Sequence, residues 1–491
     1  MTALARVARN AGWLLVNNGF ARLVGLLTSV LLARTLGVVD FGTLATVLSY
    51  ANTMIGFSDL GITAYTIREV AAQPERAEKW FPAGLLLMGL LLLLAFTAAL
   101  GGGWSLGARD SLVLVVLVCL GMALSRMGSL IGAYTQGMEH MEVLAISEGA
   151  YRFALLACVS IALALGWRLQ GVGWSYLIAG LVFLCVGFRM AVPRLLKPVR
   201  SVDWALIPRM IQGAVPYACS GYLAMIYMNV GVLFCAHWAG SAQAGYFGSA
   251  LGLMVAARTL PGLALQAAFP TMTRQVAEDA SNIEEWNSRA QRLILILLLP
   301  VSVVGIVFSR EIVLLVYGKS YMDAAPVVAV LLAICVFAGL VNASGYVFTS
   351  VNRIFVAVKI SALALVLQCG LSYLWTPRWG ALGAAWALGI ADVFTWLSCM
   401  VSLRFMLNLR FPIKAVARGL AAALLMGAAA WFLKPHLFWV GAILAALCVY
   451  GAALVAAGVL SDEDRRIFGR MVREVSGGSR DASRASRSAS G

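Results

Sequence analysis

Apolar segments long enough to cross a membrane recur along almost the whole chain. A helix needs about 20 largely apolar residues to span the hydrocarbon core of a bilayer. About fourteen such segments follow one another, beginning with Ala11–Ala33 and Phe41–Ala64 and ending with Leu437–Leu460. The pattern predicts an all-α integral membrane protein of about 14 transmembrane helices, joined by short polar stretches.

The segments divide into two sets of six and a final pair. The junction of the first two segments, LLARTLGVVDFGTLATV, has a counterpart between the seventh and eighth, LFCAHWAGSAQAGYFGSALGL, with Gly42 opposite Gly245. Two halves of six helices have the same orientation, related by an axis along the membrane normal, and a substrate site is expected between them. We therefore expect two six-helix lobes around a central cavity, at 1–200 and 201–410, an additional helix pair at 411–460 and a disordered basic tail at 461–491.

Composition and charge narrow the class of protein. A chain that is 61% hydrophobic, with only 12% charged residues and a mean hydropathy of +0.88, cannot be water-soluble. Its net charge of +15 comes mainly from Lys and Arg in alternate loops, with about 26 of the 37 on the side of the N-terminus and about seven on the other. The distribution of charge thus predicts that both termini lie in the cytoplasm. Nucleic-acid binding is not indicated, because the sequence lacks basic patches with interleaved aromatic residues.

Motifs for catalysis, metals or cofactors are missing from the sequence. The nine cysteines all fall in apolar segments without a CxxC spacing, and none of the three histidines has a second metal ligand at a suitable distance. No GxxxxGK[ST] motif for ATP occurs. Membrane polymerases and glycosyltransferases usually need a sizeable outer loop, whereas every predicted outer loop is short. We expect no enzyme activity, no catalytic residue, no metal and no cofactor.

Ionisable and amide side chains inside the segments indicate a polar interior. An ionisable group at mid-bilayer costs about 2.5 to 3.5 kcal/mol on insertion scales, so it needs a partner, an aqueous cavity or a function. Helical spacing places such residues on one face of each of the first two segments. The first face carries Asn18 and Arg22, and the second carries Asn52 and Asp59. Four later segments add Arg126, Glu148 with Arg152, Arg258 and Asp392.

Arginines dominate this set and favour an anionic ligand. Arg22, Arg126 and Arg258 lack a partner three or four residues away on their own segment. A guanidinium is permanently charged and matches phosphate oxygens, so several around a cavity suit a pyrophosphate. The alternative is ion pairing between helices, for instance Arg22 with Asp59, and Glu148 with Arg152 fits a structural pair equally well.

These considerations give nine candidate residues in two roles. The expected substrate-binding residues are Arg22, Arg126, Arg258, Arg152, Asn18 and Asn52. An ion gradient would act through an acid inside the membrane, which leaves Asp59, Asp392 and Glu148 as ion-coupling candidates, with Asp59 preferred.

Several short motifs resemble those of a known family. They comprise an asparagine and an arginine in the first segment, the turn Arg34-x-Leu36-Gly37 with Phe41-Gly42, the triplet Asp59-Leu60-Gly61, and Tyr317, Gly318, Tyr321 and Ala325 after the ninth segment. Residues 11–410 are thereby similar to polysaccharide and O-antigen flippases of the multidrug/oligosaccharidyl-lipid/polysaccharide exporter superfamily. The last two segments lie outside the six-plus-six core, as in its fourteen-helix members.

The resemblance implies a function and a location. It implies alternating access across a bacterial inner membrane, with an undecaprenyl-pyrophosphate-linked oligosaccharide as substrate, membrane lipid around it, and a polysaccharide polymerase or export machinery as partner. An ion-coupled multidrug exporter of the same superfamily is the alternative, and a membrane glycosyltransferase or polymerase is a further one. An exporter of organic cations should favour acids in its cavity, whereas arginines are the more central residues here.

Overall fold

The chain folds into long helices that pack side by side. The computed structural model describes residues 3–74, 77–105, 112–195, 203–279, 282–351, 353–409 and 413–458, and these contain helices and no strand. The predicted tail at 461–491 and the boundary between residues 200 and 201 lie outside the described residues. The all-α fold class is confirmed.

The helices follow the apolar segments of the sequence. In chain order they are α1 (Ala3–Gly56), α2 (Ile62–Ala72), α3 (Ala77–Ser105), α4 (Leu112–Gly137), α5 (Met141–Ala164), α6 (Arg168–Leu195), α7 (Leu206–Ala239), α8 (Ser241–Ala257), α9 (Thr259–Glu278), α10 (Asn282–Val307), α11 (Ser309–Val316), η3 (Lys319–Ala324), α12 (Ala325–Ser350), α13 (Ile354–Leu407), α14 (Ile413–Leu433) and α15 (Trp439–Ala456).

Eleven helices of the described part are long and apolar enough to cross a membrane, so the chain is a multi-pass membrane protein. Helices α1 and α13 have 54 residues each, and a straight helix of that length would reach about 80 Å. Non-helical glycines, Gly37 (φ 78°) and Gly380 (φ 57°), divide each of them into two arms. The count of about fourteen spans stays a prediction.

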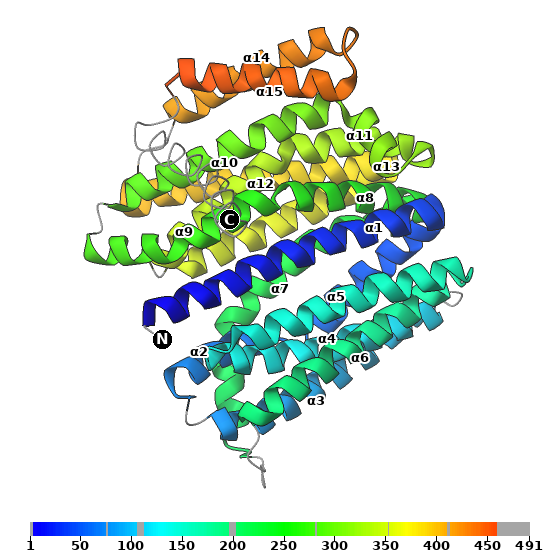
Figure 1. Ribbon diagram of the computed structural model, residues 1–491, viewed down its shortest axis with the longest axis vertical. Helices are drawn as coiled ribbons and strands as arrows, with labels where there is room; N and C mark the ends of the chain where they lie inside the picture. Colours follow the sequence, from blue (N-terminus) through cyan, green and yellow to red (C-terminus); the bar gives the residue numbers. More distant parts are fainter. Residues whose placement is uncertain are drawn as a thin grey trace, which may run out of the picture.

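Figure 1 shows two groups of helices and a separate pair. Helices α2 to α6 pack together as the first group, and α8 to α13 form the second, with α14 and α15 on its flank against α10. Helix α1 runs between the groups and contacts α5 on one side and α8 on the other. Helix α7 crosses from the first group, where it meets α2, to the second, where it meets α13. The boundaries of the two predicted lobes stay a prediction.

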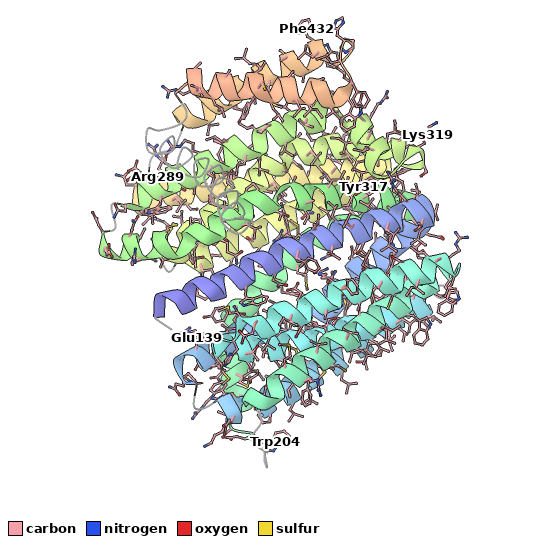
Figure 2. All side chains as sticks on the ribbon, viewed as in Figure 1. Glu139, Trp204, Arg289, Tyr317, Lys319 and Phe432 are labelled. Atoms are coloured by element: carbon pink, nitrogen blue, oxygen red, sulfur yellow. The ribbon has the colours of Figure 1, made fainter. Side chains whose placement is uncertain are left out.

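The helix ends gather at two opposite ends of the molecule. In Figure 2, Tyr317 and Lys319 lie at one end, whereas Glu139 and Arg289 lie at the other, which is also the end of the N-terminus. We call these the Lys319 end and the N-terminal end. Alternate connections reach opposite ends, as the hydropathy pattern predicts for a polytopic protein.

Helices α14 and α15 are held to the second group by polar contacts. Lys434 Nζ lies 2.9 Å from Glu311 Oε1 and donates to the carbonyl oxygen of Val307 at 2.7 Å. The hydroxyl of Tyr450 donates to the carbonyl of Ile296 at 3.3 Å. The pair is therefore fixed to α10 and α11.

The predicted second segment, Phe41–Ala64, is not one helix. Helix α1 ends at Gly56, and a turn with Leu60 (φ 38°) and Gly61 (φ 73°) leads into α2. The carboxylate of Asp59 accepts a hydrogen bond from the backbone N–H of Thr63 at 2.9 Å. Because aspartate competes for backbone donors, it favours a helix start over a helix interior. Asp59 therefore lies in a turn.

Candidate functional site

Helix α1 and the second group meet backbone to backbone at the Lys319 end. A Cβ atom built on Gly42 of α1 would overlap the carbonyl oxygen of Ser241, and one on Gly245 of α8 would lie 2.5 Å from the carbonyl oxygen of Val38. Five residues before each lies a glycine in the same conformation, Gly37 (φ 78°, ψ 176°) and Gly240 (φ 88°, ψ 171°). The internal repeat seen in the sequence thus brings its two glycines into direct contact.

Side chains of the family-like motifs surround this contact. Arg34 donates from Nε to the carbonyl of Val316 at 2.7 Å, and from Nη2 to the carbonyl of Leu315, at the C-terminus of α11. The hydroxyl of Tyr321, whose side chain is fully buried, donates to the carbonyl of Gly37 at 3.3 Å. We call Gly42, Gly245, Arg34 and Tyr321 the glycine seam, and its tight packing closes the Lys319 end between the groups.

Helix α7 joins the groups toward the N-terminal end. The hydroxyl of Tyr222 donates to the carbonyl of Thr53 at 3.2 Å, and that of Tyr217 accepts from Arg68 at 3.1 Å. The thioether of Met225 covers Gly56 and lies 4.0 Å from Arg126 Nη2. These contacts use half-buried side chains of one helix.

A cavity of about 670 Å³ lies between α1 and the second group. It is lined by Arg22 of α1, Arg258 at the junction of α8 and α9, Asp392 of α13, and by uncharged polar and apolar residues, and we call it the Arg258 cavity. Arg22 donates to the hydroxyl of Thr259 at 3.3 Å, whereas Arg258 makes no hydrogen bond with a described residue. Two arginines and one carboxylate among its lining residues give it a net charge of +1.

Asp392 is the most buried acid of the candidate set. Its exposed fraction is 4%. Oδ1 accepts a hydrogen bond from the hydroxyl of Tyr227 at 2.8 Å, while Oδ2 has no hydrogen-bond partner among the described residues. One carboxylate oxygen is thus held by α7 and the other is free for a further partner.

A second cavity, of about 380 Å³, lies between α1 and the first group and is called the Arg126 cavity. Asn52, Arg126, Glu148 and Arg152 line it. Glu148 accepts a hydrogen bond from Asn17 at 2.8 Å and lies 3.6 Å from Nη2 of Arg152. The two arginines and one glutamate again give a net charge of +1. The carboxylate of Glu148 offsets much of the positive charge of Arg152. The guanidinium of Arg126, in contrast, contacts only the sulfur of Met225 among the described polar partners.

Helix α1 separates the two cavities. Arg22 faces the Arg258 cavity, and a Cβ built three residues later on Gly25 would lie 3.7 Å from Arg152 Nη1 on the other side. The nine predicted residues therefore divide: Arg22, Arg258 and Asp392 lie around one cavity and Asn52, Arg126, Glu148 and Arg152 around the other. Asp59 lies in its turn and forms no ion pair with Arg22 among the described contacts, and the side chain of Asn18 lies outside the described residues.

Three further residues contact the candidate residues, although the sequence alone does not single them out. Asn17 binds Glu148, Tyr227 binds Asp392, and Met225 contacts Arg126. Asn17 adjoins the predicted Asn18, so a polar pair on α1 was visible in the sequence. Tyr227 and Met225 carry no such signal, because an apolar segment contains many residues of these types.

Sequence comparison identifies two families. Residues 7–276 match the model of the family described as polysaccharide biosynthesis protein, and residues 262–450 match that of the lipid II flippase MurJ. No curated protein matches the chain.

Several solved structures share the fold. A lipid II flippase MurJ in an inward closed conformation superposes with a TM-score of 0.72 over 89% of this chain and 97% of its own, at 14% identity. An inward-facing multidrug resistance MATE transporter of the MOP superfamily superposes with a TM-score of 0.60 over 80% of this chain and 96% of its own, at 15% identity. A MOP superfamily transporter from Pyrococcus furiosus superposes with a TM-score of 0.55 over 82% of this chain and 94% of its own, at 14% identity. It is described with a reversed polarity of its binding pocket. The fold is that of flippases and transporters.

Proposed function

Because the chain belongs to the polysaccharide biosynthesis protein family, we propose that it is a flippase that moves a lipid-linked oligosaccharide across a bacterial inner membrane. The observation that carries the proposal is the Arg258 cavity, in which arginines of α1 and the second group line one space of about 670 Å³. Its volume lies within the range of about 300 to 1,000 Å³ typical of ligand pockets. The headgroup of the substrate would occupy this cavity.

The pyrophosphate is assigned to Arg22 and Arg258. Arg258 has donors that no described residue uses, and Arg22 uses one in a bond to the neutral hydroxyl of Thr259. Guanidinium donors bind phosphate oxygens in charge-assisted pairs. Arg126, Arg152, Asn52 and Asn18 are the further substrate-binding candidates, and Arg126 would become available once Met225 of α7 moves away. The two cavities thus supply successive contacts on either side of α1.

Transport would proceed by alternating access. The glycine seam closes the Lys319 end, which we assign to the outer face because alternate loops at the N-terminal end carry most of the Lys and Arg. Both termini would then lie in the cytoplasm. A polysaccharide polymerase or export machinery would take the product at the outer face.

Ion coupling is assigned first to Asp392. Its free oxygen Oδ2 and its place in the cavity of Arg258 allow its charge to affect substrate binding. Glu148 is engaged by Asn17 and Arg152, and Asp59 by the backbone of α2, so both have partners that would have to be replaced during the cycle. The sequence alone favours Asp59, and the geometry gives Asp392 the better position.

An ion-coupled multidrug exporter is the second candidate, since MATE transporters share the fold. Such a cavity should hold organic cations with acids. Both cavities here have a net charge of +1, and their acids are outnumbered by arginines. The charge therefore favours an anionic substrate over a cationic drug. A glycosyltransferase or polymerase receives no support from this arrangement.

The double variant Arg22→Ala with Arg258→Ala tests the function. We expect export of lipid-linked oligosaccharide to fall at least about 100-fold, since each charged hydrogen bond contributes about 1.5 to 3 kcal/mol. The matched control is Arg310→Ala, an exposed arginine of α11 outside both cavities. Normal membrane levels with undiminished export would contradict the proposal, as would high affinity of the wild type for cationic dyes but none for the lipid-linked sugar.

A further inference from the structure

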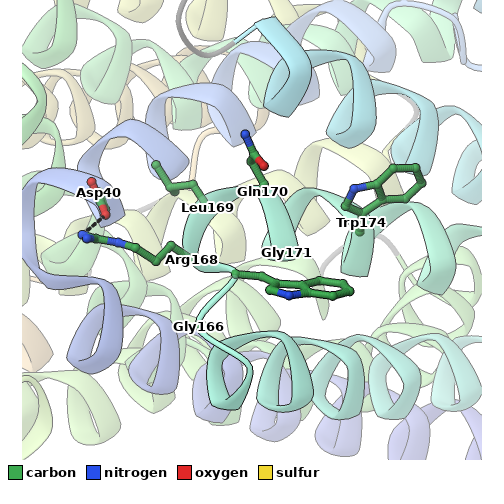
Figure 3. A pocket seen from close by; sticks show the side chains of 8 residues that line it. Asp40, Gly166, Arg168, Leu169, Gln170, Gly171 and Trp174 are labelled. Carbon is green, nitrogen blue, oxygen red and sulfur yellow. Dashed lines mark hydrogen bonds and ion pairs between the residues drawn. The ribbon is translucent and has the colours of Figure 1, made fainter.

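A third hollow, of about 750 Å³, lies outside both arginine cavities (Figure 3). It is lined by Asp40 of α1, by residues 166–171 at the connection of α5 and α6, and by Trp174 of α6. Asp40 lies two residues before Gly42, so the hollow adjoins the glycine seam at the Lys319 end. It therefore opens on the proposed outer face.

The hollow combines aromatic surface with planar polar groups. The indoles of Trp167 and Trp174 have exposed fractions of 58% and 49%. Figure 3 shows Arg168 directed at Asp40, with Gln170 and Trp174 beyond it. Arg168 Nη2 and Asp40 Oδ2 are 2.6 Å apart, and the side chain of Arg168 is 72% exposed, so most of its donors face the hollow or solvent.

The chemistry selects a neutral, hydroxyl-rich ligand. The charges of Asp40 and Arg168 cancel, so an anion such as phosphate would meet the carboxylate together with the guanidinium. A sugar ring, in contrast, presents an apolar C–H face that can pack on an indole. Its hydroxyls can both donate to a carboxylate and accept from a guanidinium or amide. The volume is sufficient for a short oligosaccharide.

We propose that this hollow is a carbohydrate-binding site, which takes up the sugar portion of the transported lipid as it emerges beside the seam. The inference rests on the proposed function for the identity of the sugar. The competing explanation of the two indoles is anchoring at the membrane interface, where tryptophans are enriched. Interface anchoring requires an amphipathic ring but no hollow with an ion pair.

The test measures binding of a free glycan to the purified full-length protein in nanodiscs. The probe is the oligosaccharide released by mild acid from the lipid-linked pool of the source cells, and binding is followed by saturation-transfer NMR and calorimetry. We expect Trp167→Leu with Trp174→Leu to weaken binding at least about tenfold, since leucine lacks the flat ring face on which the C–H groups of a sugar pack. The corresponding tyrosine variants should bind within about threefold of wild type, because they keep a ring.

The controls separate this site from the transport cavity. Trp379→Leu, an exposed indole on α13 outside the hollow, should leave binding unchanged. Absence of binding to the wild type, or equal binding by the leucine and wild-type proteins, would overturn the proposal. Loss of membrane level in the leucine variants with intact affinity would assign the indoles to anchoring and overturn it as well. Free-glycan binding needs no transport, so unchanged export in the Arg22 and Arg258 double variant would contradict the assignment of the headgroup to the Arg258 cavity and leave this result standing.

Discussion

Helix α1 is held by different kinds of contact at α8 and at α7. At the Lys319 end, Gly42 and Gly245 bring two backbones together, and a fully buried tyrosine, Tyr321, bonds across them. Toward the N-terminal end, α7 contacts α1 through the half-buried side chains of Tyr222 and Met225, while its backbone packs on Gly61, where a Cβ would lie 2.5 Å from the carbonyl oxygen of Ala214. A backbone contact cannot rearrange by rotamer changes, whereas a methionine side chain has three rotatable bonds.

Because of this difference, the two ends should differ in how readily they open. Opening the Lys319 end has to separate the groups along the seam and break the bonds of Arg34 to α11. Opening the N-terminal end can begin with a shift of one helix and a new Met225 rotamer. We therefore expect the N-terminal end to open more readily than the Lys319 end. Three substitutions examine the comparison, in order of decreasing effect.

Gly42→Leu should have the largest effect, because its side chain would overlap the backbone of Ser241. Overpacking of this kind costs about 1 to 3 kcal/mol, so we expect export to fall about tenfold or more. An introduced cysteine at Asn342 in the Arg258 cavity, with the nine native cysteines replaced, should become accessible to an impermeant reagent from outside. Gly19→Ala on the same helix, where a Cβ has no neighbour within 4 Å, is the control. Unchanged outer accessibility in Gly42→Leu would show that the seam is not the outer barrier.

Arg34→Gln should have an intermediate effect. The variant loses the charged donors to the carbonyls of Leu315 and Val316, while the glycine contact remains. We expect a reduction of export of about threefold, because a partly exposed hydrogen bond contributes about 0.5 to 1.5 kcal/mol. The same cysteine assay should show a small rise in outer labelling. The control is Arg310→Gln on α11, which should behave as wild type. Equal defects in both variants would show that the bonds of Arg34 at the seam have no special role in export.

Met225→Ala should have the smallest effect on export. Removing the thioether from Gly56 and Arg126 opens space at a half-buried site without breaking a backbone contact. We expect export within about twofold of wild type, since the contact of this side chain with Arg126 is a weak one. A cysteine at Ser129 in the Arg126 cavity should be labelled faster in inside-out vesicles. If labelling and export match those of Met406→Ala, an exposed methionine of α13 outside both cavities, Met225 does not cover the Arg126 cavity.

Much of the fold follows directly from the sequence. Apolar length alone predicts the helices, and the repeated junction predicts that Gly42 and Gly245 correspond. The end of α1 at Gly56 was missed, because hydropathy continues through Asp59 while the local backbone bonds of Ser58 and Asp59 end the helix. Hydropathy measures partitioning into lipid and is insensitive to such turns.

The candidate site was predictable residue by residue but not as an arrangement. Membrane depth indicates Arg22, Arg126 and Arg258, yet the packing of α1 between the two helix groups separates them into two cavities. Likewise, the sequence assigns no structural role to the motif residues Arg34 and Tyr321, and both lie at the seam. Arg34 reaches Val316 across 282 residues of chain, and no local pattern encodes such a contact.

The seam has a consequence for how this architecture can diversify. Since its central contact is made by backbone atoms of two glycines, it carries no side-chain information about the cargo. Residues around the Arg258 cavity and the tryptophan hollow can therefore be exchanged for those suited to another glycan without retuning the closure. Engineering of cargo preference and engineering of cycling speed become separable problems, each with its own set of positions.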